Sequence, residues 1–220
     1  MKFLTKSILA TAIACCFSAT VLADNSVAGG FVGVGTGYDF HNKMKTDTGG
    51  SAKKDNNANI SINGGYDFGN WRAYGEYTYN ANAKDTEEND LGYAKEKEVY
   101  KWNSHDITFN ADWTPQVADN FRLVVGAYTG YSFGHVKADY SKEYYSGGSY
   151  HGESKDDLTG WLLGARVGGI YDLDKNSSID FGVKFDHTWY KDIDWSEYTY
   201  TTDFDRNKFG AYVGYKFKFN

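Results

Sequence analysis

Cysteine is nearly missing from this chain, and both cysteines lie in one short segment. Cys15 and Cys16 belong to an N-terminal stretch with a basic start, a short apolar run and small residues before a cleavage point. This pattern predicts a secretory signal peptide, residues 1–23, cut after Ala23. A lipoprotein signal ending at one of the two cysteines is the alternative. Cleavage at Ala23 leaves residues 24–220 without cysteine, which excludes a disulfide or a thiolate metal site there.

Long apolar runs and an excess of basic charge are also missing. No segment after the signal peptide approaches the roughly 20 apolar residues of a transmembrane helix. The formal net charge of the whole chain is −6, and loss of Lys2 and Lys6 with the signal peptide makes it −8. A nucleic-acid-binding surface is basic, so this class of partner is excluded.

Proline occurs once, whereas tyrosine, phenylalanine and glycine are frequent, as in a protein of many strands. In "SSIDFGVKFDHTWY" every second residue is apolar or aromatic, which indicates a strand with one apolar and one polar face. Seven other segments show the same period, each about the length of a tilted strand that crosses a bilayer. The eight predicted strands are residues 29–41, 58–68, 71–80, 105–113, 121–133, 160–173, 177–190 and 208–220.

The connections between these strands alternate in length. Short links lie at 69–70, 114–120 and 174–176. Long polar segments, which we interpret as surface loops, lie at about 42–57, 81–98, 135–158 and 191–206. Long loops on one side and short turns on the other are typical of outer-membrane barrels, with the long loops outside the cell. We therefore predict an all-β fold, an eight-stranded antiparallel transmembrane up-and-down β-barrel over residues 24–220, with a periplasmic N-terminus.

Aromatic residues gather at both ends of the apolar faces, whose middles are aliphatic or small. Two aromatic girdles around an aliphatic band predict a lipid-facing exterior. A lipocalin-like soluble barrel would turn the same face inward, and its rings would not need to collect at two rims. The predicted girdle residues are Tyr38, Phe68, Trp71, Tyr79, Trp113, Phe121, Tyr131, Phe133, Trp161, Tyr171, Trp189 and Phe217.

The charged faces then point into the barrel. Six basic and six acidic side chains are expected there, and equal numbers allow each buried charge to be paired. An eight-stranded barrel is just wide enough for side chains to fill it, which argues against an open channel. The predicted lumen ion-pair network consists of Arg72, Glu76, Asp106, Asp112, Arg122, Arg166, Asp172, Asp180, Lys184, Asp186, Lys216 and Lys218.

The long segments carry the candidate contacts to other molecules. The first is basic, with Lys43, Lys45, Lys53 and Lys54, and is either a solvated loop or attracted to phosphates and acidic glycans. The second is acidic but lacks a calcium-loop pattern. The third combines tyrosine with serine and glycine, either as a recognition surface or as a strand pair continuing above the membrane. The fourth is expected to form a protruding hairpin with an adhesive edge. The candidate surface contacts are Tyr140, Tyr144, Tyr145, Tyr150, Trp195, Tyr198, Tyr200 and Phe204.

No catalytic constellation is recognised, so we predict neither an enzyme nor a cofactor or metal site. His187 precedes Thr188 and His105 follows Ser104, but neither lies in a known nucleophile motif. His135 and His151 have acidic neighbours but no metal-ligand spacing.

The C-terminal third, "GARVGGIYDLDKNSSIDFGVKFDHTWY" with the ending "GAYVGYKFKF", resembles the opacity-type and OmpX/Ail-type small outer-membrane proteins. The resemblance implies a Gram-negative cell-surface protein whose loops act in adhesion, invasion or resistance to host defences. It also implies contact with outer-membrane lipid and lipopolysaccharide, and with a host surface protein or glycan. Such chains usually end on an aromatic residue as part of their assembly signal, whereas this one ends on Asn220.

We therefore expect an adhesin or host-interaction protein. A small porin-like permeability protein with a charged, gated lumen is the alternative, and a lipid-active barrel enzyme is a third hypothesis.

Overall fold

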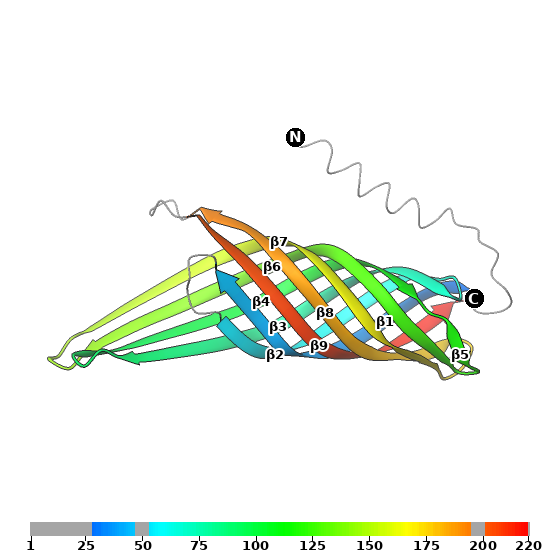
Figure 1. Cartoon of the computed structure of the whole chain (residues 1–220), viewed down its shortest axis with the longest axis horizontal. Coiled ribbons are helices and arrows are strands. Elements are labelled where there is room, and N and C mark those ends of the chain that lie inside the picture. The colour runs from blue at the N-terminus through cyan, green and yellow to red at the C-terminus, as the bar shows by residue number, and fades with distance from the viewer. Residues whose placement is uncertain (1–27, 47–52, 195–200, 220) are drawn as a thin grey trace.

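The computed structural model describes residues 28–46, 53–194 and 201–219, and it confirms the predicted eight-stranded antiparallel up-and-down barrel. Neighbouring strands pair in chain order, and the ring is closed because β1 pairs with β9 while β4 pairs with β6 (Figure 1). The very short β5 lies beside β6, outside the ring order. The strands are β1 (Gly29–Thr46), β2 (Lys53–Asp67), β3 (Trp71–Asp90), β4 (Ala94–Trp113), β5 (Gln116–Ala118), β6 (Phe121–Tyr144), β7 (Ser149–Asp172), β8 (Ser177–Asp194) and β9 (Thr201–Phe219).

One end of the barrel carries the short links, the start of β1 and the end of β9. We call it the turn end. Here the predicted strand limits agree with the structure to within one residue. The turns contain residues that favour them: Gly69 has a positive φ of 94°, and its N–H donates to the Asp67 carboxylate at 2.8 Å. Asp174 likewise accepts hydrogen bonds from the backbone N–H groups of Asn176 and Ser177.

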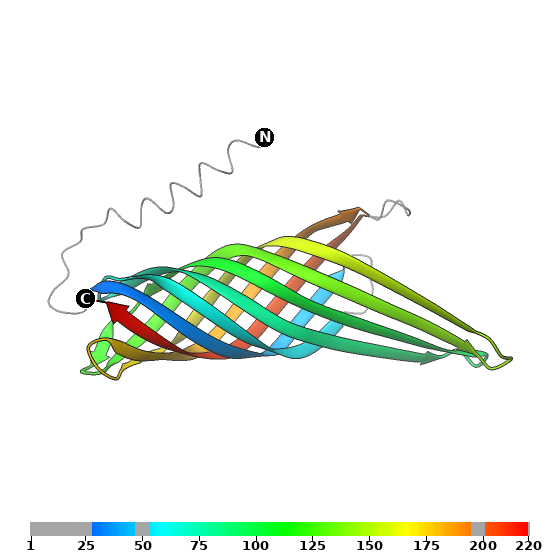
Figure 2. The ribbon, with the colours of Figure 1, turned by 180° about the vertical axis from the view of Figure 1, so that it is seen from behind.

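The opposite end, the hairpin end, differs from the prediction. Most residues that we assigned to the long loops continue the strands instead, and β3 and β4 are separated only by residues 91–93. Figures 1 and 2 show the β3–β4 and β6–β7 hairpins reaching far beyond the ends of β1, β2, β8 and β9. The backbone of a polar segment forms strand hydrogen bonds as well as that of an apolar segment does. The strand extensions were therefore not recognised, because they lack an alternating apolar pattern.

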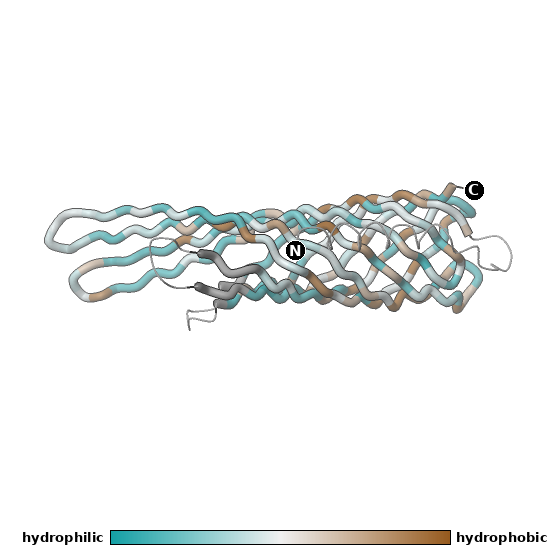
Figure 3. The backbone as a smooth tube through the Cα atoms, turned by 90° about the horizontal axis from the view of Figure 1, so that it is seen from above, coloured by the Kyte–Doolittle hydropathy of each residue, from teal (hydrophilic) through white to brown (hydrophobic). Residues whose placement is uncertain are grey.

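The outside of the barrel is apolar and exposed. Val34, Ile62 and Ile107 in the middle of their strands are 55%, 59% and 56% exposed. Figure 3 shows hydrophobic residues banded along the barrel, whereas the long hairpins are mostly hydrophilic. An apolar belt this extensive is typical of a surface that contacts lipid. None of the described residues forms a helix long and apolar enough to cross a membrane.

The twelve predicted girdle residues lie on this outer surface. Nine of them are exposed, and Phe68, Tyr79 and Phe121 are half-buried. Trp161 and Trp189 stack on each other near the hairpin end, with ring centroids 5.0 Å apart.

Register shifts mark the level at which the hairpin end begins. They lie between Asp39 and Asn42 in the β1–β2 pairing and between Asn80 and Ala83 in the β3–β4 pairing. Each shift inverts the alternation of the strand, because the extra residue opposes no partner. As a result, Met44 and Ala83 point inward, although an uninterrupted period of two would have placed them outside.

These inward residues contribute to an apolar cap, which closes the lumen at the hairpin end. Its members are Met44, Ala83, Trp102, Leu158 and Tyr190, each at most 6% exposed. They come from five strands, so the cap joins the bases of both long hairpins to the rest of the barrel.

Candidate functional site

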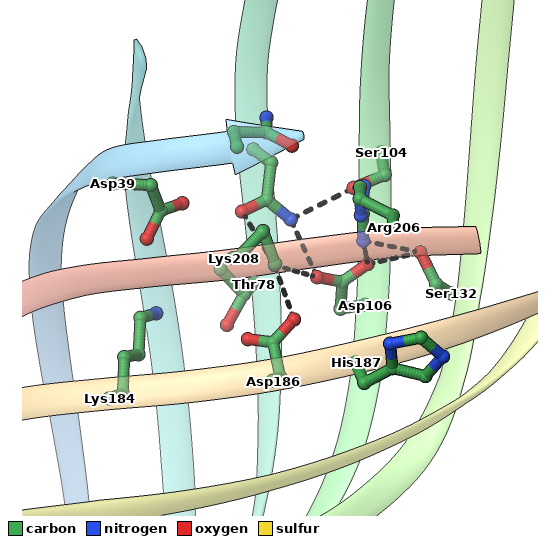
Figure 4. Close-up of polar contacts among 12 residues, drawn as sticks. Asp39, Thr78, Ser104, Asp106, Ser132, Lys184, Asp186, His187, Arg206 and Lys208 are labelled. Carbon is green, nitrogen blue, oxygen red and sulfur yellow. Dashed lines mark hydrogen bonds and ion pairs between the residues drawn. The ribbon is translucent and has the colours of Figure 1, made fainter. Parts of the chain in front are cut away.

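The interior of the barrel holds its charged side chains in ion-paired layers. In the layer next to the apolar cap, Asp106 accepts hydrogen bonds from Lys208 at 2.9 Å and Ser132 at 2.6 Å, and Arg206 lies at 3.4 Å (Figure 4). Asp186 lies 3.6 Å from Lys208 on the other side. All of these charged groups are at least nine-tenths buried, so the layer is a desolvated network in which each charge faces an opposite one.

A second layer lies in the middle of the barrel. Asp112 accepts hydrogen bonds from Arg72 at 2.7 Å and from Arg166, while Asp180 binds Arg72 at 2.6 Å and Lys216 at 2.8 Å. The cations also surround the ring of the buried Tyr74, 4.5–5.6 Å from its centroid. Gly164 makes room for the Tyr128 ring, with which a Cβ there would collide, and the Tyr128 hydroxyl donates to Asp186 of the first layer.

A third layer lies at the turn end. Arg122 binds Asp67 at 2.8 Å and Asp172 at 2.9 Å, and Lys218 lies 3.2 Å from Asp67. Together the three layers fill most of the barrel along its length.

The structure places all twelve predicted lumen residues on the inner wall. Eight are buried, and Glu76, Asp172, Lys184 and Lys218 are half-buried. Four further charged residues share the interior and were missed: Asp39, Asp67, Arg206 and Lys208. We assigned Arg206 to the last loop. It lies an even number of residues before Lys216, so in one continuous strand both side chains point to the same face. This spacing was the signal that would have placed Arg206 in the lumen. Among the residues whose side chains the structure describes, the corrected inventory has eight basic and eight acidic side chains, so the equal numbers remain.

A small central cavity of about 40 Å³ lies among the charged side chains, and the half-buried Glu76 and Lys184 are among those that line it. Glu76 accepts from Asn63 at 3.3 Å, and Lys184 donates to Asn59 at 3.5 Å. The cavity has room for about three water molecules. The apolar cap and the ion-paired layers fill most of the described lumen, and the small cavity lies between the first two layers.

The structure separates the histidine–hydroxyl neighbours considered in the sequence analysis. His105 points outward and binds the hydroxyl of Tyr77 at 2.7 Å, whereas Ser104 is buried inside the barrel. Thr188 is also buried inside, while His187 binds Asn207 at 2.8 Å. Strand alternation separates each pair onto opposite faces of the wall.

His135 and His151 lie in the long β6–β7 hairpin. His135 binds Asp157 at 2.7 Å. His151 pairs in register with Ser141. The described residues contain no group of three histidine, cysteine or acidic side chains that could hold a metal ion.

Beyond the barrel rim, the two long hairpins join into one four-stranded protruding sheet. We define it as residues 81–90 of β3, 94–103 of β4, 134–144 of β6 and 149–159 of β7. The two hairpins pair directly with each other, from Asn103↔His135 to Ala94↔Tyr144. The sheet therefore stands as a single unit at the hairpin end (Figures 1 and 2).

Within the described chain, no strand lies beside the β7 edge of the protruding sheet, and at its other edge residues 81–90 of β3 likewise pair only with β4. Pairing between β7 and β8 begins at Gly160↔Tyr190, so residues 149–159 pair only with β6 within the described chain. This edge has the sequence "SYHGESKDDLT", whose charges disfavour indiscriminate strand addition and restrict it to a complementary segment.

The tip of the sheet carries exposed aromatic and aliphatic side chains from both hairpins. We call Leu91, Tyr93, Tyr144 and Tyr145 the tip cluster; they are 42%, 58%, 39% and 56% exposed. The hairpins are joined here by a hydrogen bond from the Tyr145 N–H to the Tyr93 carbonyl at 3.0 Å. Gly92, with a φ of 78°, allows the tight turn that presents its two neighbours.

Charged groups hold the tip cluster in place. The ammonium of Lys142 lies 5.3 Å from the ring centroid of Tyr93 and 5.5 Å from that of Tyr144. Its hydrogen bond to Glu96 raises the pKa of Lys142 and lowers that of Glu96. The Tyr145 hydroxyl donates to Asp90 at 2.8 Å, and this bond raises the pKa of Tyr145. The rings are therefore presented in fixed positions although they face solvent.

The predicted surface contacts separate into three groups. Tyr144 and Tyr145 lie in the tip cluster, and Tyr150 is 60% exposed at the start of β7. Tyr140 is half-buried and donates its hydroxyl to Glu96 at 3.0 Å. Trp195, Tyr198 and Tyr200 lie outside the described residues, and for Phe204 only the backbone, paired in β9, is described.

Leu91 and Tyr93 were missed because the acidic second segment was interpreted as a solvated loop. The sequence "LGY", with apolar residues on both sides of a glycine, was the available signal.

A closed barrel with an apolar belt, aromatic rims and a charged, filled interior defines an integral outer-membrane β-barrel protein. The family profile described as "Outer membrane protein beta-barrel domain" matches residues 8–217, and the chain belongs to this family. It is located in the bacterial outer membrane, so the turn end faces the periplasm and the protruding sheet faces outward.

Several solved structures are similar to this chain. The attachment invasion locus protein Ail of Yersinia pestis is 18% identical, with 86% of this chain and 99% of that chain covered and a TM-score of 0.46. Neisserial surface protein A is also 18% identical, with 87% and 99% covered and a TM-score of 0.46. OprG from Pseudomonas aeruginosa is 13% identical, with 89% and 98% covered and a TM-score of 0.41. The predicted resemblance to small outer-membrane β-barrel proteins is confirmed by the family profile. A comparison with curated proteins finds no match.

Proposed function

We propose that this protein is an adhesin-type surface-recognition protein, which binds a host or other cell surface through its protruding sheet. The observation that carries the proposal is the tip cluster. Its large side chains are 39–58% exposed at the tip of the two hairpins, which reach farther from the barrel than the other described strands do. Tyrosine supplies contact area at low entropic cost and is enriched at recognition surfaces.

The unpaired β7 edge is the second element of this proposal. A partner strand added there would gain main-chain hydrogen bonds, and the alternating charges would select its sequence. The edge starts beside the tip cluster, since Glu143 pairs with Ser149 where the hairpin turns. The tip cluster and the edge therefore form one continuous candidate contact surface for a host surface protein, with a surface glycan as the alternative partner.

A porin-like permeability function has weaker support. The apolar cap and the ion-paired layers occlude the described lumen, and the central cavity of about 40 Å³ is enclosed between two of those layers. A lipid-active enzyme has less support still, because the candidate histidines and hydroxyls lie on opposite faces of the wall.

The first test is adherence of a non-adherent laboratory bacterium that expresses the protein. A triple variant, Tyr93→Ser, Tyr144→Ser and Tyr145→Ser, removes three rings of the tip cluster and is expected to reduce binding to cultured cells about tenfold. The matched control is Val117→Ser, which removes an exposed apolar side chain at the turn end. Heat-modifiable mobility on gels verifies that each variant is folded. Equal adherence of wild type and the triple variant contradicts the proposal, as does wild-type adherence no higher than that of the empty strain.

A further inference from the structure

The charges along the β7 edge of the protruding sheet are complementary to themselves. The edge contains the segment "HGESKDD", centred on Ser154. If two such edges run antiparallel with their Ser154 residues opposite each other, Glu153 of each copy lies opposite Lys155 of the other. In the same register His151 lies opposite Asp157. Opposite charges that face each other across two strands stabilise a sheet, so this register favours pairing of the edge with itself.

The backbone of the edge has the alternation that this register requires. The N–H of Tyr144 donates to the carbonyl of Gly148 at 3.0 Å, in the same register as the β6–β7 pairing. Hydrogen-bonded and non-hydrogen-bonded positions alternate in an antiparallel pair, so the even-numbered residues of β7 bond to β6. The odd-numbered residues of 149–159 therefore direct their N–H and C=O groups toward the free edge. The complementary charges are all among them: His151, Glu153, Lys155 and Asp157.

These charged side chains are accessible to a second copy. The side chain of Lys155 is 56% exposed, that of Glu153 is 40% exposed and that of Asp157 is 89% exposed. Within the chain, Glu153 lies 2.8 Å from Lys137 and Asp157 lies 2.7 Å from His135. A second copy would extend these exposed pairs into one network across the joined edges.

The inward face of the edge matches in the same register. Tyr150, which is 60% exposed, comes opposite Leu158 of the second copy, at the apolar cap. Ser154 comes opposite Ser154, so two small side chains meet at the centre. Neither face of the joined sheet therefore brings like charges together.

The other free edge of the protruding sheet lacks this property. Residues 81–90 of β3 have the sequence "ANAKDTEEND", in which Lys84 is the single basic residue. One lysine in each copy cannot match the acidic residues of that edge, which are Asp85, Glu87, Glu88 and Asp90. Of the two edges, self-complementarity is thus a property of β7.

The register also fixes how the two barrels are placed. A two-fold axis between the paired Ser154 residues reverses the strand direction, so the barrels lie at opposite ends of the joined sheet and point in opposite directions. Two copies in facing membranes have this arrangement. In one membrane the two β7 strands would run parallel and the charge matching would be lost. Residues 149–159 span roughly 35 Å at about 3.4 Å per residue, which sets the scale of the membrane separation.

We propose that the β7 edge joins two copies of this protein, held in two facing outer membranes, by antiparallel pairing of β7 with β7. The inference rests on the unpaired edge of the proposed function and not on the tip cluster. It names a second copy as a partner of that edge. Membranes that carry the protein then adhere to each other.

The first test reverses charges on the edge. The purified full chain is reconstituted into phosphatidylcholine vesicles, and clustering of the vesicles is followed by light scattering. Glu153→Lys places lysine opposite Lys155 of the second copy, and Lys155→Glu places glutamate opposite Glu153. The two-fold axis repeats each like-charge contact, so each variant alone should self-pair roughly thirtyfold more weakly.

Mixing vesicles of the two variants restores opposite charges at each of these contacts, so clustering should return to near the wild-type level. The matched control is Lys95→Glu, which makes the same charge change on β4, away from the edge, and should cluster as wild type does.

The second test locates the register with a cysteine. Residues 24–220 contain no cysteine, so Ser154→Cys introduces a single thiol. Opposite residues at a non-hydrogen-bonded position have Cα atoms about 4.5 Å apart, within the range of a disulfide. Mild oxidation should give a covalent dimer of this variant. Ser149→Cys is the matched control, because the register places its two copies far apart.

Three results would overturn the proposal. Wild-type vesicles could cluster no more than protein-free vesicles. The mixture of charge variants could cluster as weakly as each variant alone, which would show a general effect of charge. Ser149→Cys could cross-link as readily as Ser154→Cys, which would show random collision. The triple tip variant should cluster vesicles as wild type does, so failure of self-pairing and failure of host adherence are separate results. Unchanged heat-modifiable mobility verifies that each variant is folded.

Discussion

The lumen and the protruding sheet share strands β3, β4, β6 and β7, but their charged side chains are arranged differently. In the lumen, acidic and basic groups are equal in number, and Asp106, Asp112 and Asp180 each contact two cations. In the protruding sheet, like charges lie directly opposite one another, as Lys84 and Lys101 do on the outward face and Glu87 and Glu98 do on the inward face. Ion pairs occur there as well, such as Lys137 with Glu153 and Lys142 with Glu96. Where water is excluded, an unpaired charge is too costly to persist, but in solvent charges can be placed for recognition.

The largest effect is expected in the ion-paired layer next to the apolar cap. Replacement Asp106→Asn leaves Arg206 and Lys208 without their shared carboxylate, in a site where neither can reach solvent. Breaking one side of a buried pair costs about 4 kcal/mol. The free energy of unfolding, measured by urea titration in lipid vesicles, should fall by this amount. Asp157→Asn, which removes an exposed carboxylate on β7, is the control; similar losses in both variants would show that burial does not distinguish the two regions.

A smaller effect is expected in the apolar cap, at the boundary of the two regions. Leu158→Ala removes a side chain that is 2% exposed, and the resulting cavity costs about 3 kcal/mol of unfolding free energy. Leu163→Ala on the same strand removes a leucine that faces lipid and is 44% exposed, so lipid fills the space and the loss is smaller. The same urea titration compares the two variants. An equal cost for both would mean that the cap is not packed as described.

The smallest effect concerns the exposed ion pairs of the protruding sheet. Hydrogen bonds from Lys137 and Lys155 lower the pKa of Glu153 from 4.5 to about 2. Because the folded pKa lies below the unfolded one, this contribution to stability is complete above pH 4.5 and is lost as the pH falls toward 2. A carboxyl NMR titration should place the Glu153 midpoint near 2 in wild type and higher in Lys137→Met. A midpoint near 4.5 in wild type would show that these pairs do not form in solution.

The barrel was predictable because burial and lipid impose an alternating pattern on each strand. Strand number, order and turn-end limits all followed from it, since Asp67 and Gly69 at the turns interrupt the apolar pattern sharply. The length of β3, β4, β6 and β7 did not follow, because outside the membrane both faces are polar and nothing marks where a strand ends.

The candidate site was only partly predictable for a related reason. Tyr144 and Tyr145 were found by composition alone, whereas their contact with Tyr93 depends on long-range pairing between two hairpins. The side chain of Ala83 points inward because of a register shift, and no residue type in the sequence indicates that shift. The alignment of Lys84, Lys101, Lys137 and Lys155 across four strands follows only from their register, because these lysines are far apart in the sequence.

The register shift between Asn80 and Ala83 also bears on how such a protein can change over generations. Above that point, the strands of the protruding sheet pair mainly with one another. Inserting two residues into each strand of a hairpin moves the tip outward by about 7 Å along the strands, keeps which side chains face outward and leaves the barrel untouched. One residue inserted into each strand would instead reverse which side chains beyond it face outward. The length of the hairpins can therefore change in steps of two residues per strand with little effect on the stability of the barrel in the membrane. The side chains at the tip can change independently of hairpin length and of the barrel.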